Sequence, residues 1–213
     1  MSKLIGIMGL KGSGKNTIAK MLPVKWKRMA FADTLKDIVS ILFGWDRDLI
    51  EGDTEYSRKW REEVNEYWAK ELGNKDFTPR MALQVLGTDV FRNNFDRDIW
   101  VKVLKRKIIN SNSDVVVTDV RFPNEANMIK SLGGKIVQVI RGELPEWWET
   151  AKELNNKHIY RPDDLEKWKQ LEGIHPSEYS LAGVIEPDYV IHNDGTLDDL
   201  HIKVDEMLKK LYS

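Results

Sequence analysis

The chain has 213 residues, a formal net charge of −1 and no cysteine. This length predicts one large domain, or a core with a substantial insertion, that can bury a hydrophobic core. Disulfides and thiolate metal sites are excluded, and the near-zero charge excludes a global basic field that would hold nucleic acid. No apolar run approaches the length of a membrane span, and residues 1–3 lead into a predicted strand. We therefore expect a cytoplasmic protein with no membrane partner and no stable nucleic-acid binding.

The first predicted unit is a strand at residues 3–8, a glycine-rich loop at 9–17 and a helix at 15–22. The loop reads GLKGSGKNT and matches the phosphate-binding pattern G-x-x-x-x-G-K-[ST] up to its last position. Glycines let successive backbone N–H groups surround phosphate oxygens, and Lys15 would reach the β- and γ-phosphates. The alternative is a glycine-rich turn that binds nothing, which the flanking strand and helix disfavour.

Position 16 departs from this pattern. Asn16 stands where Ser or Thr normally offers a hydroxyl to Mg²⁺, and the hydroxyl comes one residue later, at Thr17. We expect Thr17 to be the better candidate for the Mg²⁺ ligand, with Asn16 as the second.

Residues 29–32 predict a short strand, and Asp33 is the candidate N-cap of an amphipathic helix at 34–43. An acidic residue after a strand of an open α/β sheet lies where ligands bind. Asp33 therefore has two interpretations, a cap alone or a cap that also contacts substrate.

The next region, residues 45–76, is densely charged. Trp60, Val64, Tyr67 and Trp68 recur at helical spacing and predict one helix with a single apolar stripe, whereas Arg58, Lys59 and Arg61 lie off that stripe and are expected to face water. A helix is predicted from Thr78-Pro79 to about residue 91, and another at 98–109. Gly87 inside the former requires the close approach of another group.

A buried strand at residues 115–117 leads to Asp119 and Arg121. An apolar strand that ends in Asp resembles a Walker B strand, whose carboxylate orients Mg²⁺. Arg121 could pair with Asp119 or bind a phosphate. A helix at 123–132 and a strand at 135–140 complete a βαβ unit, so these strands are predicted to be parallel.

Residues 143–187 form a long polar insertion with helices predicted at 146–155 and 163–171, and it is a lid candidate. Its cluster around His175 is weak as a metal or nucleophile motif. A strand at 189–191 and a helix that starts with a capping box, Thr196 to Asp199, close the chain.

The predicted fold class is α/β: a P-loop kinase core of about five parallel strands with helices on both faces. We expect a single domain whose core comprises residues 1–44, 98–142 and 188–213. A helical acceptor-binding insertion would occupy residues 45–97 and the lid residues 143–187. This layout is typical of small-molecule kinases, which must exclude water before they transfer a phosphoryl group.

Several motifs resemble the deoxynucleoside monophosphate kinases of tailed bacteriophages. They are FADTLK at residues 31–36, LQVLGTD at 83–89, NNFDR at 93–97 with Trp100-Val101, TDVR at 118–121 with Glu125, His175-x-Ser177-Glu178, and Asn193-Asp194-Gly195. They occur in the same order along essentially the whole chain. Asn or Asp commonly follows the P-loop lysine in that family. Residues 45–76 and 143–187 differ most from it.

The resemblance implies transfer of the ATP γ-phosphoryl group to the 5′-phosphate of a deoxynucleoside monophosphate (dNMP). That acceptor is already anionic, so no general base is required. The implied catalytic residues are Lys15, Asp119, Arg121 and Arg141. ATP would contact Lys11, Gly12, Ser13, Gly14, Lys15, Asn16, Thr17, Asn193 and Asp194, and Mg²⁺ would be held by Thr17, Asn16 and Asp119. The acceptor would contact Asp33, Lys36, Arg80, Gln84, Thr88, Arg92, His175, Ser177 and Glu178.

Asp96 and Arg97 are expected to form a structural ion pair, with a role in the site as the alternative. The expected partners are the small-molecule substrates and a second copy of the chain in a homodimer. A phage-encoded protein would act in the host cytoplasm.

The sequence is also compatible with two other functions. One is a P-loop kinase for another small acceptor, such as dephospho-coenzyme A. The other is a nucleotide-binding regulatory or nucleic-acid module that transfers no phosphate.

Overall fold

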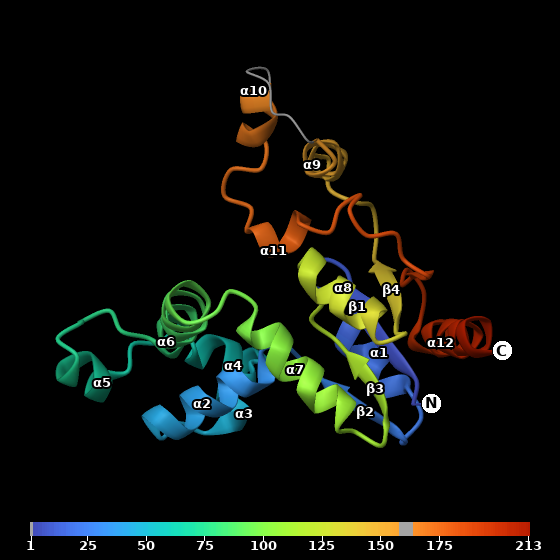
Figure 1. Ribbon diagram of the computed structural model, residues 1–213. Coiled ribbons are helices and arrows are strands. Elements are labelled where there is room, and N and C mark those ends of the chain that lie inside the picture. Colours follow the sequence, from blue (N-terminus) through green and yellow to red (C-terminus); the bar gives the residue numbers. More distant parts are fainter. Residues whose placement is uncertain (1, 158–163) are drawn as a thin grey trace. The chain divides into compact units, whose positions relative to one another are not determined.

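The computed structural model describes residues 2–157 and 164–213, and its centre is a five-stranded parallel sheet (Figure 1). The strands are β1 (Leu4–Met8), β2 (Trp26–Met29), β3 (Asp114–Val117), β4 (Lys135–Ile140) and β5 (Tyr189–His192). Their order in the sheet is β2-β3-β1-β4-β5, and all four neighbouring pairs are parallel. The predicted α/β class and the number of strands are confirmed.

Two compact units make up the chain. The first comprises residues 1–30 and 105–213 and contains the whole sheet, whereas the second comprises residues 31–104.

Helices cover both faces of the sheet in the first unit. On one face α1 (Lys15–Met21) and α12 (Leu197–Tyr212) pack together, and Ile18, Val204 and Met207 are fully buried against the strands. On the other face lies α8 (Pro123–Ser131), which contacts β1 and β4. Both faces of each central strand are therefore buried, which explains why the strands read as continuous apolar runs.

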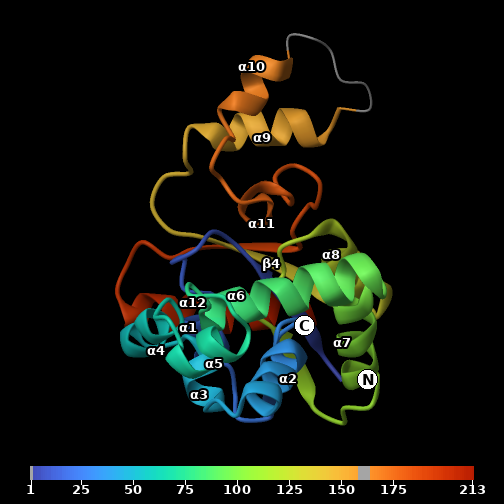
Figure 2. The same ribbon diagram turned by 90° about the vertical axis from the view of Figure 1, so that its left-hand side faces the viewer.

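The described part of residues 143–187 carries three short helices with a small core of their own. These are α9 (Trp147–Asn155), α10 (Asp164–Lys169) and α11 (Pro176–Tyr179), and α9 contacts both of the others (Figure 2). Ala151, Leu154, Leu171 and Ala182 are buried between them. The two helices predicted in this insertion are confirmed, although residue 163, where the second was expected to begin, lies outside the described residues.

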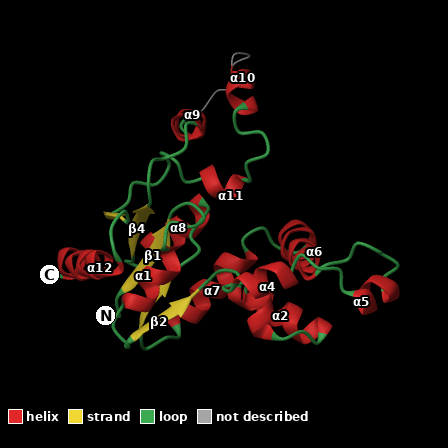
Figure 3. Ribbon diagram, turned by 180° about the vertical axis from the view of Figure 1, so that it is seen from behind, coloured by secondary structure: helices red, strands yellow, loops and turns green. Residues whose placement is uncertain are grey.

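The second unit consists of helices and loops (Figure 3). They are α2 (Asp33–Phe43), α3 (Arg47–Glu51), α4 (Glu55–Trp60), α5 (Glu66–Glu71), α6 (Pro79–Gln84), the π-helix η1 (Val85–Asn93) and the start of α7 (Ile99–Ile109). Their core is aromatic: Phe43 stacks on Trp45, and Trp68 donates a hydrogen bond from Nε1 to the Phe43 carbonyl at 3.0 Å. Most tryptophans of this unit therefore serve packing.

Several sequence predictions need correction. The second strand lies at 26–29 instead of 29–32, because it pairs with β3 and ends where β3 ends, at Met29 opposite Val117. Asp33 is the first residue of α2, and the N-cap is Ala32. The predicted single helix around Trp60–Trp68 is two helices, because the Asn65 side chain caps a new one by accepting from Trp68 N.

The helix that begins at Pro79 was predicted to continue regularly to residue 91. It changes instead to a π-helix at Val85. Such wide turns often mark functional positions, and this one contains Thr88 and Arg92.

Candidate active site

The loop between β1 and α1 has the geometry of an anion-binding turn. Gly14, the N-cap of α1, adopts φ 103°, and a Cβ there would overlap the Asn193 side-chain amide. Only glycine meets both demands. Asn193 also donates from Nδ2 to the Ser13 carbonyl at 2.9 Å, so the loop after β5 supports the P-loop from outside. The helix N-terminus that follows is a favourable place for a phosphate.

Lys15 folds back over this loop. Its Nζ donates to the carbonyls of Gly9 and Leu10, at 2.7 and 2.8 Å. The pKa of Lys15 is lowered to about 8, mainly by burial and then by the nearby Arg121 cation, while Glu178 and Asp119 oppose the shift. Four charged groups from three segments, the P-loop, the loop after β3 and α11, thus act on one another at the P-loop.

Asp119 and Arg121 reach this place because β3 is the direct neighbour of β1 in the sheet. Asp119 is half-buried, two residues beyond the end of β3. The backbone that presents Arg121 is fixed by Glu125, whose buried carboxylate accepts from the N–H of Arg121 at 2.8 Å and of Phe122 at 3.1 Å. Glu125 therefore has a structural role that the sequence motif did not reveal.

Glu178 on α11 binds two groups that are expected to bind phosphate. One oxygen accepts from the Lys11 backbone N–H at 3.0 Å, and the other pairs with the Arg121 guanidinium at 2.9 Å. Ser177 also accepts from Arg121, at 3.1 Å. His175 caps α11, because its Nδ1 accepts from the Ser177 N–H. The predicted cluster at 175–178 is thus joined to the P-loop and to Arg121.

Arg141 follows β4 and is exposed. The next residue, Gly142, donates its N–H to Asp194 at 2.6 Å, so the loop after β5 also fixes the start of the 143–187 segment.

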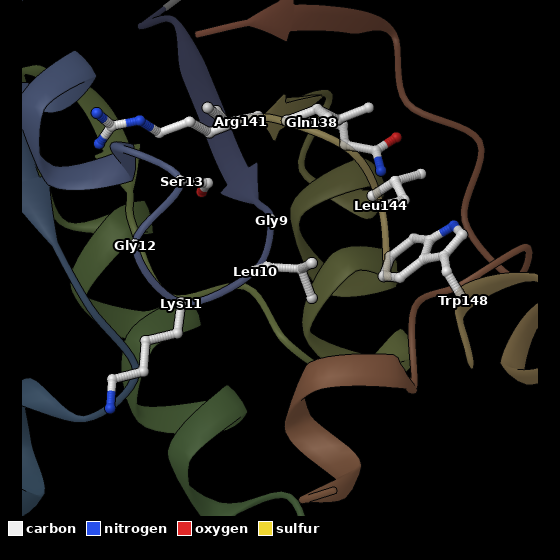
Figure 4. Close-up of a pocket in the computed structure, with 11 residues that line it drawn as sticks. Gly9, Leu10, Lys11, Gly12, Ser13, Gln138, Arg141, Leu144 and Trp148 are labelled. Carbon is white, nitrogen blue, oxygen red and sulfur yellow. The ribbon is translucent and has the colours of Figure 1, made fainter. Parts of the chain in front are cut away.

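A cavity of about 130 Å³ lies between residues 9–13 of the P-loop and the segment that runs from the end of β4 to Trp148. Figure 4 shows Leu10, Leu144 and Trp148 facing it, while the side chains of Lys11 and Arg141 extend away from the indole. Leu144 and Trp148 were not singled out in the sequence, since apolar residues in a charged insertion give no site signal.

The two candidate metal ligands on α1 differ in exposure. Asn16 is exposed and Thr17 is half-buried. Among the residues that the structure describes, no cluster of three or more His, Cys, Asp or Glu side chains could hold a metal ion. A magnesium ion that binds mainly to nucleotide phosphates does not need one.

The second unit contains six of the predicted acceptor residues. Lys36 pairs with Glu51 at 2.7 Å, and Arg80 pairs with Glu62. Asp33 lies 3.8 Å from the Arg47 guanidinium. Gln84 and Thr88 are exposed, and Arg92 is half-buried.

Gly87 has the tight surroundings that the sequence required. A Cβ there would lie 2.6 Å from Leu35 Cδ2, and the Gly87 carbonyl accepts from the buried Trp100 Nε1 at 3.0 Å. The expected ion pair of Asp96 with Arg97 is wrong. Asp96 pairs instead with Lys102, which lies on α7.

Comparison with known proteins identifies the family. Residues 50–161 match the family model described as deoxynucleotide monophosphate kinase. A mimivirus protein named for the same activity, from Acanthamoeba polyphaga mimivirus, is 30% identical over 94% of this chain and 93% of its own length. The chain belongs to the deoxynucleotide monophosphate kinase family.

A phage relative agrees with this assignment. The deoxynucleoside-5′-monophosphate kinase of Escherichia phage T5 is 25% identical over 61% of this chain and 72% of its own. A solved dephospho-CoA kinase from Campylobacter jejuni is 14% identical, with a TM-score of 0.48 over 99% of this chain and 98% of that one. That likeness is too distant to bear on the acceptor. The protein is an enzyme that phosphorylates deoxynucleoside monophosphates, and ATP is the donor that its kinase family implies. None of the helices described is long and apolar enough to cross a membrane.

Proposed function

We propose that the first unit of this deoxynucleotide monophosphate kinase binds ATP at the loop of residues 9–17 and provides the catalytic groups. The observation that carries the proposal is the convergence on Lys15 of Asp119, Arg121 and Glu178, each of which shifts its pKa. The half-buried ammonium of Lys15 already contacts two loop carbonyls. It can exchange them for phosphate oxygens without a large movement of the chain.

Transfer to a monophosphate needs charge neutralisation more than proton transfer, because the acceptor oxygen is already anionic. In the proposal, amides of residues 11–15 and the Lys15 ammonium hold the β- and γ-phosphates. Arg121 offers a planar fork of donors for the oxygens of the group in transfer. Arg141 binds phosphate from the start of the 143–187 segment. Asn193 and Asp194 border the nucleotide from the loop after β5.

Thr17 and Asp119 are the proposed ligands of Mg²⁺, with Asn16 as the alternative to Thr17. Their chemistry fits, because Mg²⁺ prefers oxygen donors and takes only one or two from protein when it binds nucleotide phosphates. Their placement also fits: Asp119 is close enough to Lys15 to raise its pKa, and Thr17 is two residues from Lys15 on α1. When bound, Mg²⁺ would neutralise charge on the phosphates.

The acceptor is assigned to the second unit. Gln84 and Thr88 are exposed on consecutive turns of α6 and η1, which leaves their polar groups available to a base or sugar. Asp33, Lys36, Arg80 and Arg92 are the further candidates there. In the 143–187 segment, His175, Ser177 and Glu178 are proposed to contact the acceptor when the P-loop is occupied. A cytoplasmic location and a homodimer belong to the same proposal.

An ADP-release assay across dNMPs, ribonucleoside monophosphates and dephospho-coenzyme A tests the choice of acceptor. We expect release only with dNMPs, or much faster release with them. Release that depends on dephospho-coenzyme A alone would refute the proposal. ADP release independent of any acceptor would indicate a hydrolase.

A further inference from the structure

Arg61 occupies an unusual position in the second unit. It is the C-cap of α4, and its side chain is half-buried. Its guanidinium lies directly over Gly52, the C-cap of the neighbouring helix α3, so that a Cβ at Gly52 would overlap it. The guanidinium therefore occupies the space that a side chain at Gly52 would need, at the end of α3. Gly52 also has φ +73°, where glycine is favoured.

Glu62 and Glu51 act on the charge of Arg61, but neither forms an ion pair with it. Its Nε is buried without a hydrogen-bond partner, and in residues 2–157 and 164–213 no ion pair reaches its side chain. Both carboxylates that raise the pKa of Arg61, Glu62 and Glu51, form ion pairs with other cations. Glu62 pairs with Arg80, whereas Glu51 binds Lys36 at 2.7 Å and Arg47 at 2.6 Å.

Arg80 is joined to Arg61 through the backbone, where the Arg80 amide N–H donates to the Arg61 carbonyl at 2.9 Å. Burial lowers the pKa of Arg61, and the positive charge of Arg80 lowers it further. A half-buried cation beside another cation destabilises the fold unless an anion is bound. Such a local cost is expected at a functional site.

The sequence predicts that Arg58, Lys59 and Arg61 all face water. The structure separates them. Arg58 and Lys59 are exposed, in agreement with that prediction, whereas Arg61 turns onto Gly52 and is half-buried.

We propose that Arg61, with Arg80 beside it, binds a phosphate monoester dianion and is the anchor for the 5′-phosphate of the dNMP. Two guanidiniums offer planar forks of N–H donors, which suit the oxygens of a phosphate. The proposal rests on the proposed function, since the acceptor is taken to bind the second unit. It adds a residue that the sequence motifs do not include.

The test compares Arg61→Gln with the matched control Arg58→Gln, an exposed arginine three residues earlier. For Arg61→Gln we expect the KM for dNMP to rise at least tenfold, since a hydrogen bond between charged groups is lost. The KM for ATP should change less than twofold, and the melting temperature should stay equal or rise. Arg58→Gln should leave all three unchanged. An unchanged KM for dNMP would overturn the proposal, as would a higher KM accompanied by a lower melting temperature.

A binding measurement without turnover separates this inference from the proposed function. The probes are a dNMP and the same deoxynucleoside without its phosphate, each added to the full chain while melting is followed. The dNMP should stabilise the wild type more than the deoxynucleoside, and Arg61→Gln should abolish that difference. Arg61→Lys should restore it in part. Persistence of the difference in Arg61→Gln would refute the anchor. Its loss in a protein that shows no dNMP-dependent turnover would support the anion site and refute the proposed function.

Discussion

The lowered pKa of Lys15 predicts a pH dependence of catalysis. A lysine near pKa 8 loses its charge within the range in which enzymes are usually assayed, unlike an ordinary lysine near 10.4. The ammonium form is the one that binds triphosphate. The second-order constant kcat/KM for ATP should therefore fall as the pH rises through 8.

The size of the effect follows from the titration. With a pKa of about 8, roughly 90% of free enzyme carries the charged Lys15 at pH 7 and roughly 10% at pH 9, so kcat/KM for ATP should fall about ninefold between them. An unshifted lysine would give a change of less than about 5% over the same range. Bound ATP should raise the pKa of Lys15, because phosphate charge replaces the neutral carbonyls of Gly9 and Leu10. The kcat profile should therefore break at a higher pH than the kcat/KM profile.

The assay is coupled ADP release at saturating dNMP, from pH 6.5 to 9.5. Lys15→Arg provides the control, since a guanidinium stays protonated throughout; its activity should be lower but its profile flat. A flat wild-type profile would refute the assignment. So would a break near pH 8 that persists in Lys15→Arg, because another group would then be responsible.

Three more outcomes follow. The folded-state pKa of Lys15 lies below its unfolded value, so the unfolded chain binds more protons between about pH 8 and 10.5. The unfolding free energy of the wild type should therefore increase relative to that of Lys15→Met as the pH rises through that window. Denaturant titration at each pH measures the difference, and a constant difference would contradict the prediction. Glu178→Gln should improve ATP binding up to about fivefold at pH 6.5, because the ion pair of Arg121 (39% exposed) with Glu178 (23% exposed) is worth at most ~1 kcal/mol. The exposed control Glu172→Gln should have no effect. Weaker binding of ATP to Glu178→Gln in a calorimetric titration would argue against displacement of the carboxylate by phosphate. Trp100→Phe should lower unfolding stability by about 1–3 kcal/mol, because the buried Gly87 carbonyl loses its donor, and an unchanged melting curve would show that this bond is dispensable.

The sheet and the donor site could be predicted because their signals are local. Residues 4–8, the glycine-rich loop and the capping box at Thr196 each specify their own geometry, and the structure has all three. The placement of Asp119 near the P-loop follows from a parallel sheet, in which the carboxyl ends of neighbouring strands meet at one edge.

What could not be predicted depends on contacts between distant residues. The stripe around Trp60–Trp68 suits one helix, but Asn65 begins a new one, and its N–H donates to the Phe77 carbonyl at 3.0 Å. Likewise, helical spacing cannot show that the Arg61 guanidinium rests on Gly52. The partner of Arg121 is Glu178, 57 residues away, which no local pattern encodes.

We propose that Lys15 and its surroundings transfer the ATP γ-phosphoryl group to a dNMP. Incubation with γ-³²P-labelled ATP and each dNMP, followed by chromatography, tests it most directly. The label is expected in deoxynucleoside diphosphate, and it should be lost with Lys15→Met but retained with Lys20→Met, an exposed lysine of the same helix. Label that appears only as inorganic phosphate, or transfer that survives Lys15→Met, would contradict the account.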